Sequence, residues 1–254
     1  MTTATLVERF YEAYTNRQPI DKEAVPETLE MSEAYRVQQL HTDKKAIDDK
    51  DNHAGYKISL TSEETQRMFN STTPLYGALT RSTISDGTIE LSRMLSPLIE
   101  LELVFIVEKD LSTEDDYESI MAKTRIVPGL EIPDSRFTNW FPNLSLGQLV
   151  ADSAVAGKVV IGNSTAELSY DQLHNIEGAL KFEGEVIASG ISSEVLGNPV
   201  HAVKWLIDEL AKHGQSLKKG AIISSGTFIL PKVLKKGKYE ASFKGVGNVI
   251  LNVI

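Results

Sequence analysis

The stretch Leu98–Asp110 reads LIELELVFIVEKD, and its alternation is typical of a β-strand. Because residues two apart in a strand point to the same face, one face is wholly apolar and the other carries Glu100 and Glu102. The apolar set consists of Ile99, Leu101, Leu103, Phe105 and Val107. The two carboxylates lie roughly 7 Å apart along the strand, so each raises the other's pKa unless a cation lies between them. A hard divalent metal suits that place. On the spacing alone, however, a half-exposed strand with its polar face in water is the simpler interpretation.

The composition is that of an ordinary globular protein. The 254 residues suffice for one large domain or two small ones, and 41% of them are hydrophobic and 24% charged. The net charge of -9 argues against a nucleic-acid partner, because no basic patch is available to neutralise phosphates. The densest basic cluster is short and is best explained as a solvated turn; it consists of Lys232, Lys235, Lys236 and Lys238.

The chain has no cysteine, which excludes disulfides, thiol nucleophiles and thiolate metal sites. Its first residues, MTTATLVERFYEAY, form an acidic amphipathic pattern unlike that of a signal peptide. No apolar run approaches the roughly 18 residues needed to span a bilayer. We therefore expect a cytoplasmic protein without a membrane partner.

Apolar periodicity predicts helices in the N-terminal segment. In the first of them the apolar residues recur every four positions, at Leu6, Phe10 and Tyr14. A second helix is expected over residues 32–47. Thr61 and Glu64 form a capping box, which predicts a short helix over residues 62–70.

Strand-like runs dominate from residue 98 onward. They cover 98–107, 158–161, 179–182, 185–191, 221–224 and 239–253, with a hairpin turning near Gly184. One helix interrupts them: Asn198 caps it, Pro199 takes its first position and Gly214 ends it. Its apolar face consists of Val203, Leu206, Ile207 and Leu210. Since no repeat or linker is present, we predict a single α+β domain over 1–254, with a helical N-terminal segment (1–75) and a β-rich core (76–254).

Other motifs with catalytic potential give weaker signals. The five histidines show no metal-ligand spacing and are best explained as surface or helix residues; they are His41, His53, His174, His201 and His213. The chain has no G-x-S-x-G elbow and no phosphate-binding P-loop. Gly245-Val246-Gly247 lies in a late strand-like run and indicates a bulge or a close backbone contact.

Two charged residues stand among apolar neighbours. Lys57, in GYKISL, is either an exposed strand charge or a partly buried lysine whose lowered pKa would let it carry protons. Glu131, in VPGLEIP, is either a third metal ligand or an edge-strand charge. The local sequence leaves both pairs of alternatives open.

Several motifs together resemble one family in their order and spacing. They are GYKISLTSEE, PLIELELVFIVEKDL, IVPGLEIPDSRFTNW, LVADSAVAGKVVIGN, LGNPVHAVKWLIDEL and the final GVGNV. From about Ser32 onward the chain resembles the fumarylacetoacetate hydrolase superfamily, in its branch of 2-hydroxypentadienoate (2-keto-4-pentenoate) hydratases and 4-oxalocrotonate decarboxylases. A single E-x-E is common, but E-x-E combined with a later Glu and an upstream GYK lysine is more specific.

The resemblance implies a mixed β-roll or sandwich core of the fumarylacetoacetate hydrolase C-terminal type, in a homo-oligomer. It also implies a divalent cation, usually magnesium or manganese, held by Glu100, Glu102 and Glu131. Lys57 would be the catalytic residue beside the substrate. The segment after Lys57, here the helix expected over 62–70, would form a mobile lid over the site.

The chemistry implied by the resemblance has a physical logic. A 2-oxo acid can reach the metal through its carboxylate and its 2-oxo oxygen, and the metal then stabilises the enolate as a Lewis acid. Lys57 as an ammonium would assist tautomerisation, while the lid would exclude bulk water. The implied activity is that of a lyase that adds water to a 2-hydroxy-2,4-dienoate, giving a 4-hydroxy-2-oxo acid in aromatic catabolism.

Three positions depart from the family pattern. Leu75 stands where the hydratases have an Asp, Val155 where they have a substrate-holding Ser, and Ser59 where Gly is usual. These changes spare the glutamates but leave the hydration step and the substrate open. One alternative is a decarboxylase on the same fold, which would need an extra cation for a second carboxylate, with Arg67, Arg81 and Arg136 as candidates. The other is a non-enzymatic relative that keeps the fold.

Overall fold

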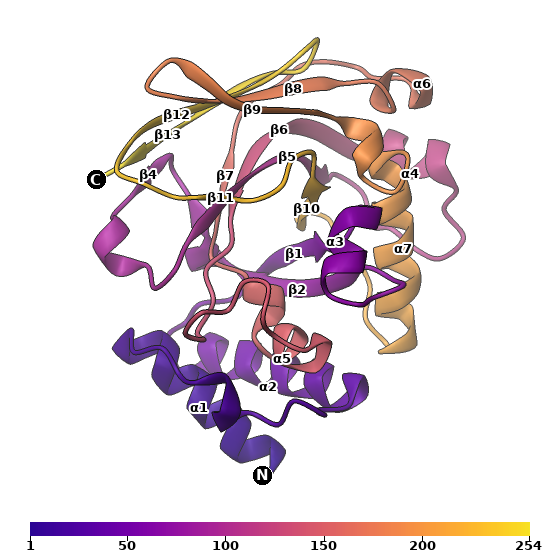
Figure 1. Ribbon diagram of the computed structural model, residues 1–254. Helices are drawn as coiled ribbons and strands as arrows, with labels where there is room; N and C mark the ends of the chain where they lie inside the picture. Colours follow the sequence, from indigo (N-terminus) through magenta and orange to yellow (C-terminus); the bar gives the residue numbers. More distant parts are fainter.

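The computed structural model describes residues 1–254, and its largest element is an eight-stranded mixed sheet (Figure 1). The strands run in the order β2-β1-β10-β5-β6-β7-β3, and β11 pairs with β5 outside this path. They are β1 (His53–Ser59), β2 (Leu75–Thr80), β3 (Ile84–Ser85), β5 (Leu98–Val107), β6 (Thr124–Ile132), β7 (Lys158–Ile161), β10 (Ile222–Thr227) and β11 (Lys232–Val233). Strand β1 is parallel to β10 and antiparallel to β2, so residues 1–75 already contribute to this sheet.

A five-stranded sheet lies at the end of the molecule opposite the N-terminal helices α1 (Thr3–Asn16) and α2 (Met31–Asp48) (Figure 1). Its order is β4-β13-β12-β8-β9. The strands are β4 (Thr88–Ile89), β8 (Glu177–Phe182), β9 (Glu185–Ile191), β12 (Gly237–Phe243) and β13 (Gly247–Val253). The curled sheets confirm the expected α+β fold with a β-roll core.

The remaining helices are α3 (Glu63–Met68), α4 (Tyr117–Lys123), α5 (Leu146–Ala151), α6 (Tyr170–Leu173) and α7 (Pro199–Lys212). Helix α7 begins as the sequence predicts, with the Asn198 side chain accepting from the Val200 N–H and Pro199 in the first turn. Gly214 follows its end in the left-handed region, at a φ of 68°. None of the helices is both long and apolar enough to cross a membrane.

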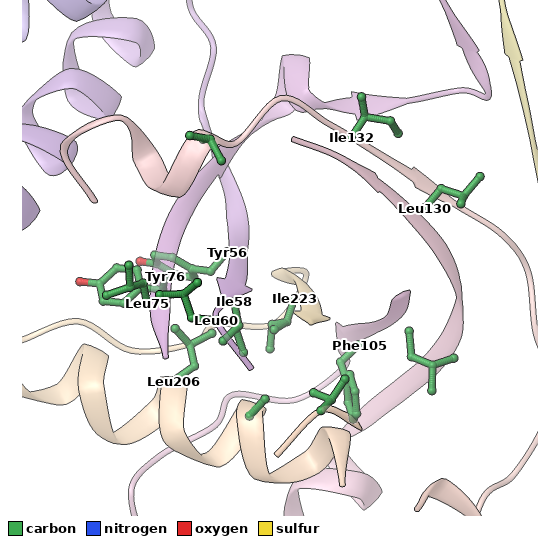
Figure 2. Close-up of a cluster of buried hydrophobic side chains, with 14 of the residues drawn as sticks. Tyr56, Ile58, Leu60, Leu75, Tyr76, Phe105, Leu130, Ile132, Leu206 and Ile223 are labelled. Atoms are coloured by element: carbon green, nitrogen blue, oxygen red, sulfur yellow. The ribbon is translucent and has the colours of Figure 1, made fainter. Parts of the chain in front are cut away.

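Strand β5 has the bounds that its alternation predicts, but both of its faces are buried. The apolar face belongs to the main core, part of which Figure 2 shows where Tyr56, Ile58 and Tyr76 from β1 and β2 approach Leu206 of α7. Glu100 and Glu102, on the other face, are only 9% and 1% exposed. The interpretation of β5 as a half-exposed strand with its polar face in water is therefore wrong, because the curled sheet covers that face too.

Two local expectations are also wrong. The cap of α3 is Ser62 rather than Thr61, and its reciprocal partner is Thr65 rather than Glu64. Thr61 is held instead against Gly226, where any added Cβ would lie 2.3 Å from the Thr61 Oγ1. The run 239–253 is not one strand but the hairpin β12–β13, which turns at Gly245 with a φ of 78°.

Candidate functional site

The pairing of β5 with β6 brings three glutamates together. Glu100 lies directly opposite Glu131 in the antiparallel register, and Glu102 is two residues further along the same face of β5. One carboxylate oxygen from each of the three lies within 4.8 Å of the others. Glu131 is 1% exposed, so it is not an edge-strand charge. The resemblance named these residues, and the sheet register explains how they meet.

Lys57 reaches the same cluster from β1. Its Nζ lies 3.0 Å from the Oε1 of Glu131, and its side chain is 2% exposed. Strands β10 and β5 separate β1 from β6 in the sheet order. In a flat sheet those strands would be about 14 Å apart, at roughly 4.8 Å per step. The curl of the sheet, together with the length of the lysine side chain, is what makes this contact possible.

Two groups that the sequence did not single out fix the orientation of Glu102. The Ser224 hydroxyl donates to the Oε2 of Glu102 at 2.6 Å, and the backbone N–H of Gly226 donates to the same oxygen at 3.1 Å. Both lie where the β10–β5 register shifts, between Ser224 and Thr227. A bulge of this kind re-aims side chains and N–H groups. The sequence signal for it is the isolated Gly in the strand-like run IISSGT.

The electrostatics of the cluster are those of buried like charges beside one cation. Burial first, and then the charge of Glu131, raise the pKa of Glu100 to about 8. Burial and the two neighbouring carboxylates also raise the pKa of Glu102. Burial alone would lower the pKa of Lys57, but the carboxylates of Glu131, Glu100 and Glu102 outweigh it and raise that pKa above its usual value. The expectation of a lowered pKa for a buried Lys57 is therefore wrong.

The cluster has the donor chemistry of a site for a hard cation. The Oε1 of Glu102 and the Oε2 of Glu131 are buried without a hydrogen-bond partner, which is costly for a carboxylate unless a cation satisfies it. The only cation in contact is Lys57. Three carboxylates of this kind can hold one magnesium, manganese or calcium ion and leave further coordination positions open.

A small cavity adjoins the cluster. Its volume is about 30 Å³, enough for a water molecule or two but too small for a five-carbon acid. Lys57, Glu100 and Glu102 contribute charged side chains to its lining, and Thr65 of α3 and Phe69, which follows α3, line it as well. A five-carbon acid can therefore enter only if part of this lining moves, and α3 with Phe69 is one part of it.

Helix α3 has few attachments to the rest of the protein. Every hydrogen bond made by residues 62–73 stays within the segment 60–73, such as that from the Gln66 side chain to the Leu60 carbonyl at 2.9 Å. Phe69 packs edge-on against Phe141, with ring centroids 5.9 Å apart. Leu60 and Asn70, on either side of the helix, both have left-handed φ values, 56° and 52°. These are the properties of a segment that opens locally at small free-energy cost.

We expect α3 to be mobile without ligand and ordered with it. Backbone amides of residues 63–68 should exchange rapidly with deuterium in the protein loaded with magnesium alone. They should exchange much more slowly when oxalate, a mimic of a bound 2-oxo acid, is added. Amides of α7 serve as the internal control and should not change. Equal protection of α3 in both states would identify it as a fixed structural helix.

None of the arginines considered for a second carboxylate lies in the cavity wall. Arg67 and Arg81 are exposed. Arg136 is buried but forms an ion pair with Asp152 and donates to the Ala156 carbonyl at 2.8 Å. Lys57 is therefore the only cationic residue that lines the cavity.

The departures from the family pattern lie in different surroundings. Leu75 belongs to the main core, beside Tyr76 and Ile58 in Figure 2, and does not line the cavity. Val155 and Ser59 do line it.

Among the histidines, His41 is 4% exposed and lies on α2 rather than at the surface. No histidine lines the cavity or joins the glutamate cluster.

Comparison with known proteins identifies the family. No family model matches the chain. The 2-keto-4-pentenoate hydratase of Paraburkholderia phymatum is 30% identical over 253 residues, which cover 96% of this chain and 95% of that protein. The chain belongs to the 2-keto-4-pentenoate hydratase family. The 2-hydroxyhexa-2,4-dienoate hydratase of Comamonas testosteroni is 31% identical over 200 residues, which cover 76% of this chain and 75% of that protein. Members of the family are lyases, and the chain is an enzyme of the hydratase type.

Solved structures agree with the family assignment. The 4-oxalocrotonate decarboxylase from Pseudomonas putida G7, complexed with magnesium and adipate, superposes with a TM-score of 0.89 at 25% identity, covering 99% of this chain and 97% of that one. A fumarylpyruvate hydrolase from Pseudomonas aeruginosa, in complex with Mn²⁺ and pyruvate, shares the fold alone, with a TM-score of 0.57 at 14% identity over 79% of this chain and 89% of that one. The resemblance seen in the motifs is thereby confirmed at both levels, the superfamily and its hydratase and decarboxylase branch.

Proposed function

We propose that the chain adds water to a 2-hydroxy-2,4-dienoate, such as 2-hydroxypenta-2,4-dienoate, giving a 4-hydroxy-2-oxo acid in aromatic catabolism. The observation that carries this proposal is the cluster of Glu100, Glu102 and Glu131 with Lys57, beside a cavity that Lys57, Glu100 and Glu102 line. The names of the related hydratases support the same reaction. The overall reaction breaks two carbon–carbon π bonds, the enol O–H bond and one O–H bond of water. It forms the C=O π bond of the 2-oxo group, one C–O bond and two C–H bonds, so no oxidant or reductant is needed.

We propose that the three glutamates hold one divalent cation, magnesium or manganese. Their buried, unpartnered oxygens support this, as do the magnesium and calcium bound by the related decarboxylase. Such a cation supplies Lewis-acid stabilisation for negative charge that develops on a 2-oxo acid. Ser224 and Gly226 keep the Oε2 of Glu102 occupied, which directs the unpartnered Oε1 toward the cluster.

Lys57 and α3 have separate roles in this proposal. The Lys57 ammonium would donate a proton to a carbon of the dienoate as the conjugated system tautomerises, and the neutral amine so formed would take up the proton lost by the 2-hydroxy oxygen. Its ion pair with Glu131 holds the Nζ in place. Thr65 and Phe69 line the cavity, and in this proposal α3 with Phe69 acts as a lid that separates the reacting water from bulk solvent.

The side chains that line the cavity favour hydration over decarboxylation of a dicarboxylate. The decarboxylase alternative needs a second cation for the second carboxylate, and no arginine lines the cavity. The overall similarity to the 4-oxalocrotonate decarboxylase is what keeps this alternative as the second candidate.

A direct assay tests the proposal. With magnesium, the enzyme should consume 2-hydroxypenta-2,4-dienoate and form 4-hydroxy-2-oxopentanoate, whereas chelation should stop the reaction and added manganese should restore it. Release of carbon dioxide from 4-oxalocrotonate without hydration of the dienoate would identify a decarboxylase instead. Inertness toward both compounds would contradict the proposal.

A cytoplasmic location and a homo-oligomeric state are further proposals, and sedimentation of the purified protein tests the second.

A further inference from the structure

Three residues with hydroxyl side chains line the cavity beside the glutamates: Ser59, Thr65 and Thr227. The protein itself uses two of these hydroxyls. That of Thr65 donates to the Ser62 carbonyl at 3.0 Å, in the capping box of α3. That of Thr227 donates to the Ile229 carbonyl at 2.9 Å and accepts from the Ile229 N–H at 3.3 Å. The half-buried Ser59 makes no side-chain hydrogen bond, yet its hydroxyl is not one of the shielded atoms left without a partner, so water can reach it.

Ser59 and Lys57 lie on the same side of β1. They are two residues apart, so strand alternation places their side chains on one face, roughly 7 Å apart along the strand. Both residues line the cavity, and the Lys57 Nζ lies 3.0 Å from the Oε1 of Glu131. An ammonium has three N–H donors, and this ion pair uses only one of them. One strand therefore brings a free hydroxyl and a cation with unused donors to the same cavity.

The hydration step needs a group that holds water beside the glutamates. Once the dienoate has tautomerised to the 2-oxo-3-enoate, addition of water forms a C–O bond at C4 and a C–H bond at C3. The Lys57 ammonium would supply the hydrogen for C3, and the neutral amine so formed would take up the proton that the water loses. C4 is two carbons beyond the 2-oxo carbon, away from the carboxylate. The group that orients the water therefore has to lie to one side of the metal ligands.

We infer that the Ser59 hydroxyl positions the water that attacks C4. The inference rests on the proposed function, which places the 2-oxo acid end of the substrate at the glutamates and Lys57. A serine hydroxyl has two lone pairs, so it can accept one hydrogen of the water and leave an oxygen lone pair of that water free to attack. Ser59 is a positioning residue in this step, because the proton of the water passes to Lys57.

The ratio of two products tests the inference. Magnesium-loaded wild type given 2-hydroxypenta-2,4-dienoate should form mainly 4-hydroxy-2-oxopentanoate, followed by NMR. Ser59→Ala should form it about tenfold more slowly, the usual worth of one hydrogen bond. The variant should still release the unhydrated tautomer, 2-oxopent-3-enoate, because Lys57 is retained. Thr227→Val is the matched control: it removes a hydroxyl from the same cavity that the protein already uses, and it should leave the product ratio unchanged.

Thermal melting without metal checks the hydrogen-bond assignment independently of activity. Ser59→Ala should melt at the wild-type temperature, because its hydroxyl has no partner in the protein to lose. Thr227→Val should melt lower, because it leaves the Ile229 N–H and carbonyl without their contacts. A lower melting temperature for Ser59→Ala would show that the hydroxyl serves the fold, and it would contradict the inference.

The kinetic outcomes separate this inference from the proposed function. An unchanged hydration rate in Ser59→Ala would overturn the inference and leave the proposed function standing. An equal fall in hydration and in tautomerisation would also overturn it, since Ser59 would then act through Lys57 or the fold rather than on the water. A wild type that releases only the tautomer would overturn the proposed hydration itself, and the inference with it.

Discussion

Replacing Glu102 with alanine should abolish metal binding. Calorimetry with manganese should show one site per chain in the wild type and no measurable binding in Glu102→Ala. The physical reason is that Glu102 supplies a buried oxygen with no other partner to a cluster whose oxygens lie within 4.8 Å of one another. The two remaining carboxylates could not neutralise a divalent cation and Lys57 together. Unchanged manganese affinity in this variant would contradict the assignment of the ligands.

Two controls distinguish loss of the ligand from loss of the fold. Ser224→Ala removes only the 2.6 Å hydrogen bond to Glu102, and loss of such an orienting contact should weaken manganese binding by about 10–100-fold. Glu102→Gln is the second control, because it removes the charge but keeps an oxygen that accepts from Ser224 and Gly226. Without metal it should melt no lower than the wild type, since it removes a buried charge that its neighbours repel. With manganese at a hundred times its Kd, only the wild type should gain about 2.7 kcal/mol of unfolding free energy.

Replacing Lys57 with methionine should lower turnover of 2-hydroxypenta-2,4-dienoate by about 10²–10⁴, the usual worth of a positioned proton-transfer group. Methionine keeps most of the bulk of the side chain but removes its charge and its protons. The variant should still bind manganese, because all three glutamates are retained. The test measures kcat and manganese affinity on the same preparation. A metal-bound variant with full activity would remove Lys57 from the mechanism.

Lys45→Met is the matched control for that prediction. Lys45 is also a buried lysine beside a carboxylate, with its Nζ 3.6 Å from the Oδ2 of Asp51, but it does not line the cavity. Its loss can lower the melting temperature through the unpaired Asp51, yet it should leave kcat within about twofold of the wild type. A comparable fall in kcat for both variants would mean that the Lys57 result reflects destabilisation rather than chemistry.

Much of the fold could be predicted because many elements carry strong local signals. The strand-like runs 98–107, 158–161 and 185–191 match the observed bounds of β5, β7 and β9, and the cap at Asn198 marks the start of α7. Local signals failed where neighbouring residues offered the same chemistry, as at Thr61 and Ser62, or where a turn lay within a strand-like run, as at Gly245.

The site itself depended on features that local sequence does not contain. The resemblance named Lys57 and the glutamates, but the contact of Lys57 with Glu131 exists only because the sheet curls across β10 and β5. Periodicity could not reveal that both faces of β5 are buried, or that the surrounding carboxylates would raise the pKa of Lys57. Ser224 and the Arg136–Asp152 pair went unnoticed because each acts through a residue distant in sequence.

The placement of the three glutamates on β5 and β6 alone has an evolutionary consequence. These neighbouring strands hold the whole carboxylate cluster. Lys57 comes from β1, whereas α3 and the cavity-lining Val155 come from segments that connect strands. Mutations in those other elements can therefore alter which bond is made or broken without disturbing the carboxylates. An ancestral protein of this kind could diversify its reactions by inheriting one strand pair unchanged and varying the parts of the chain that surround it.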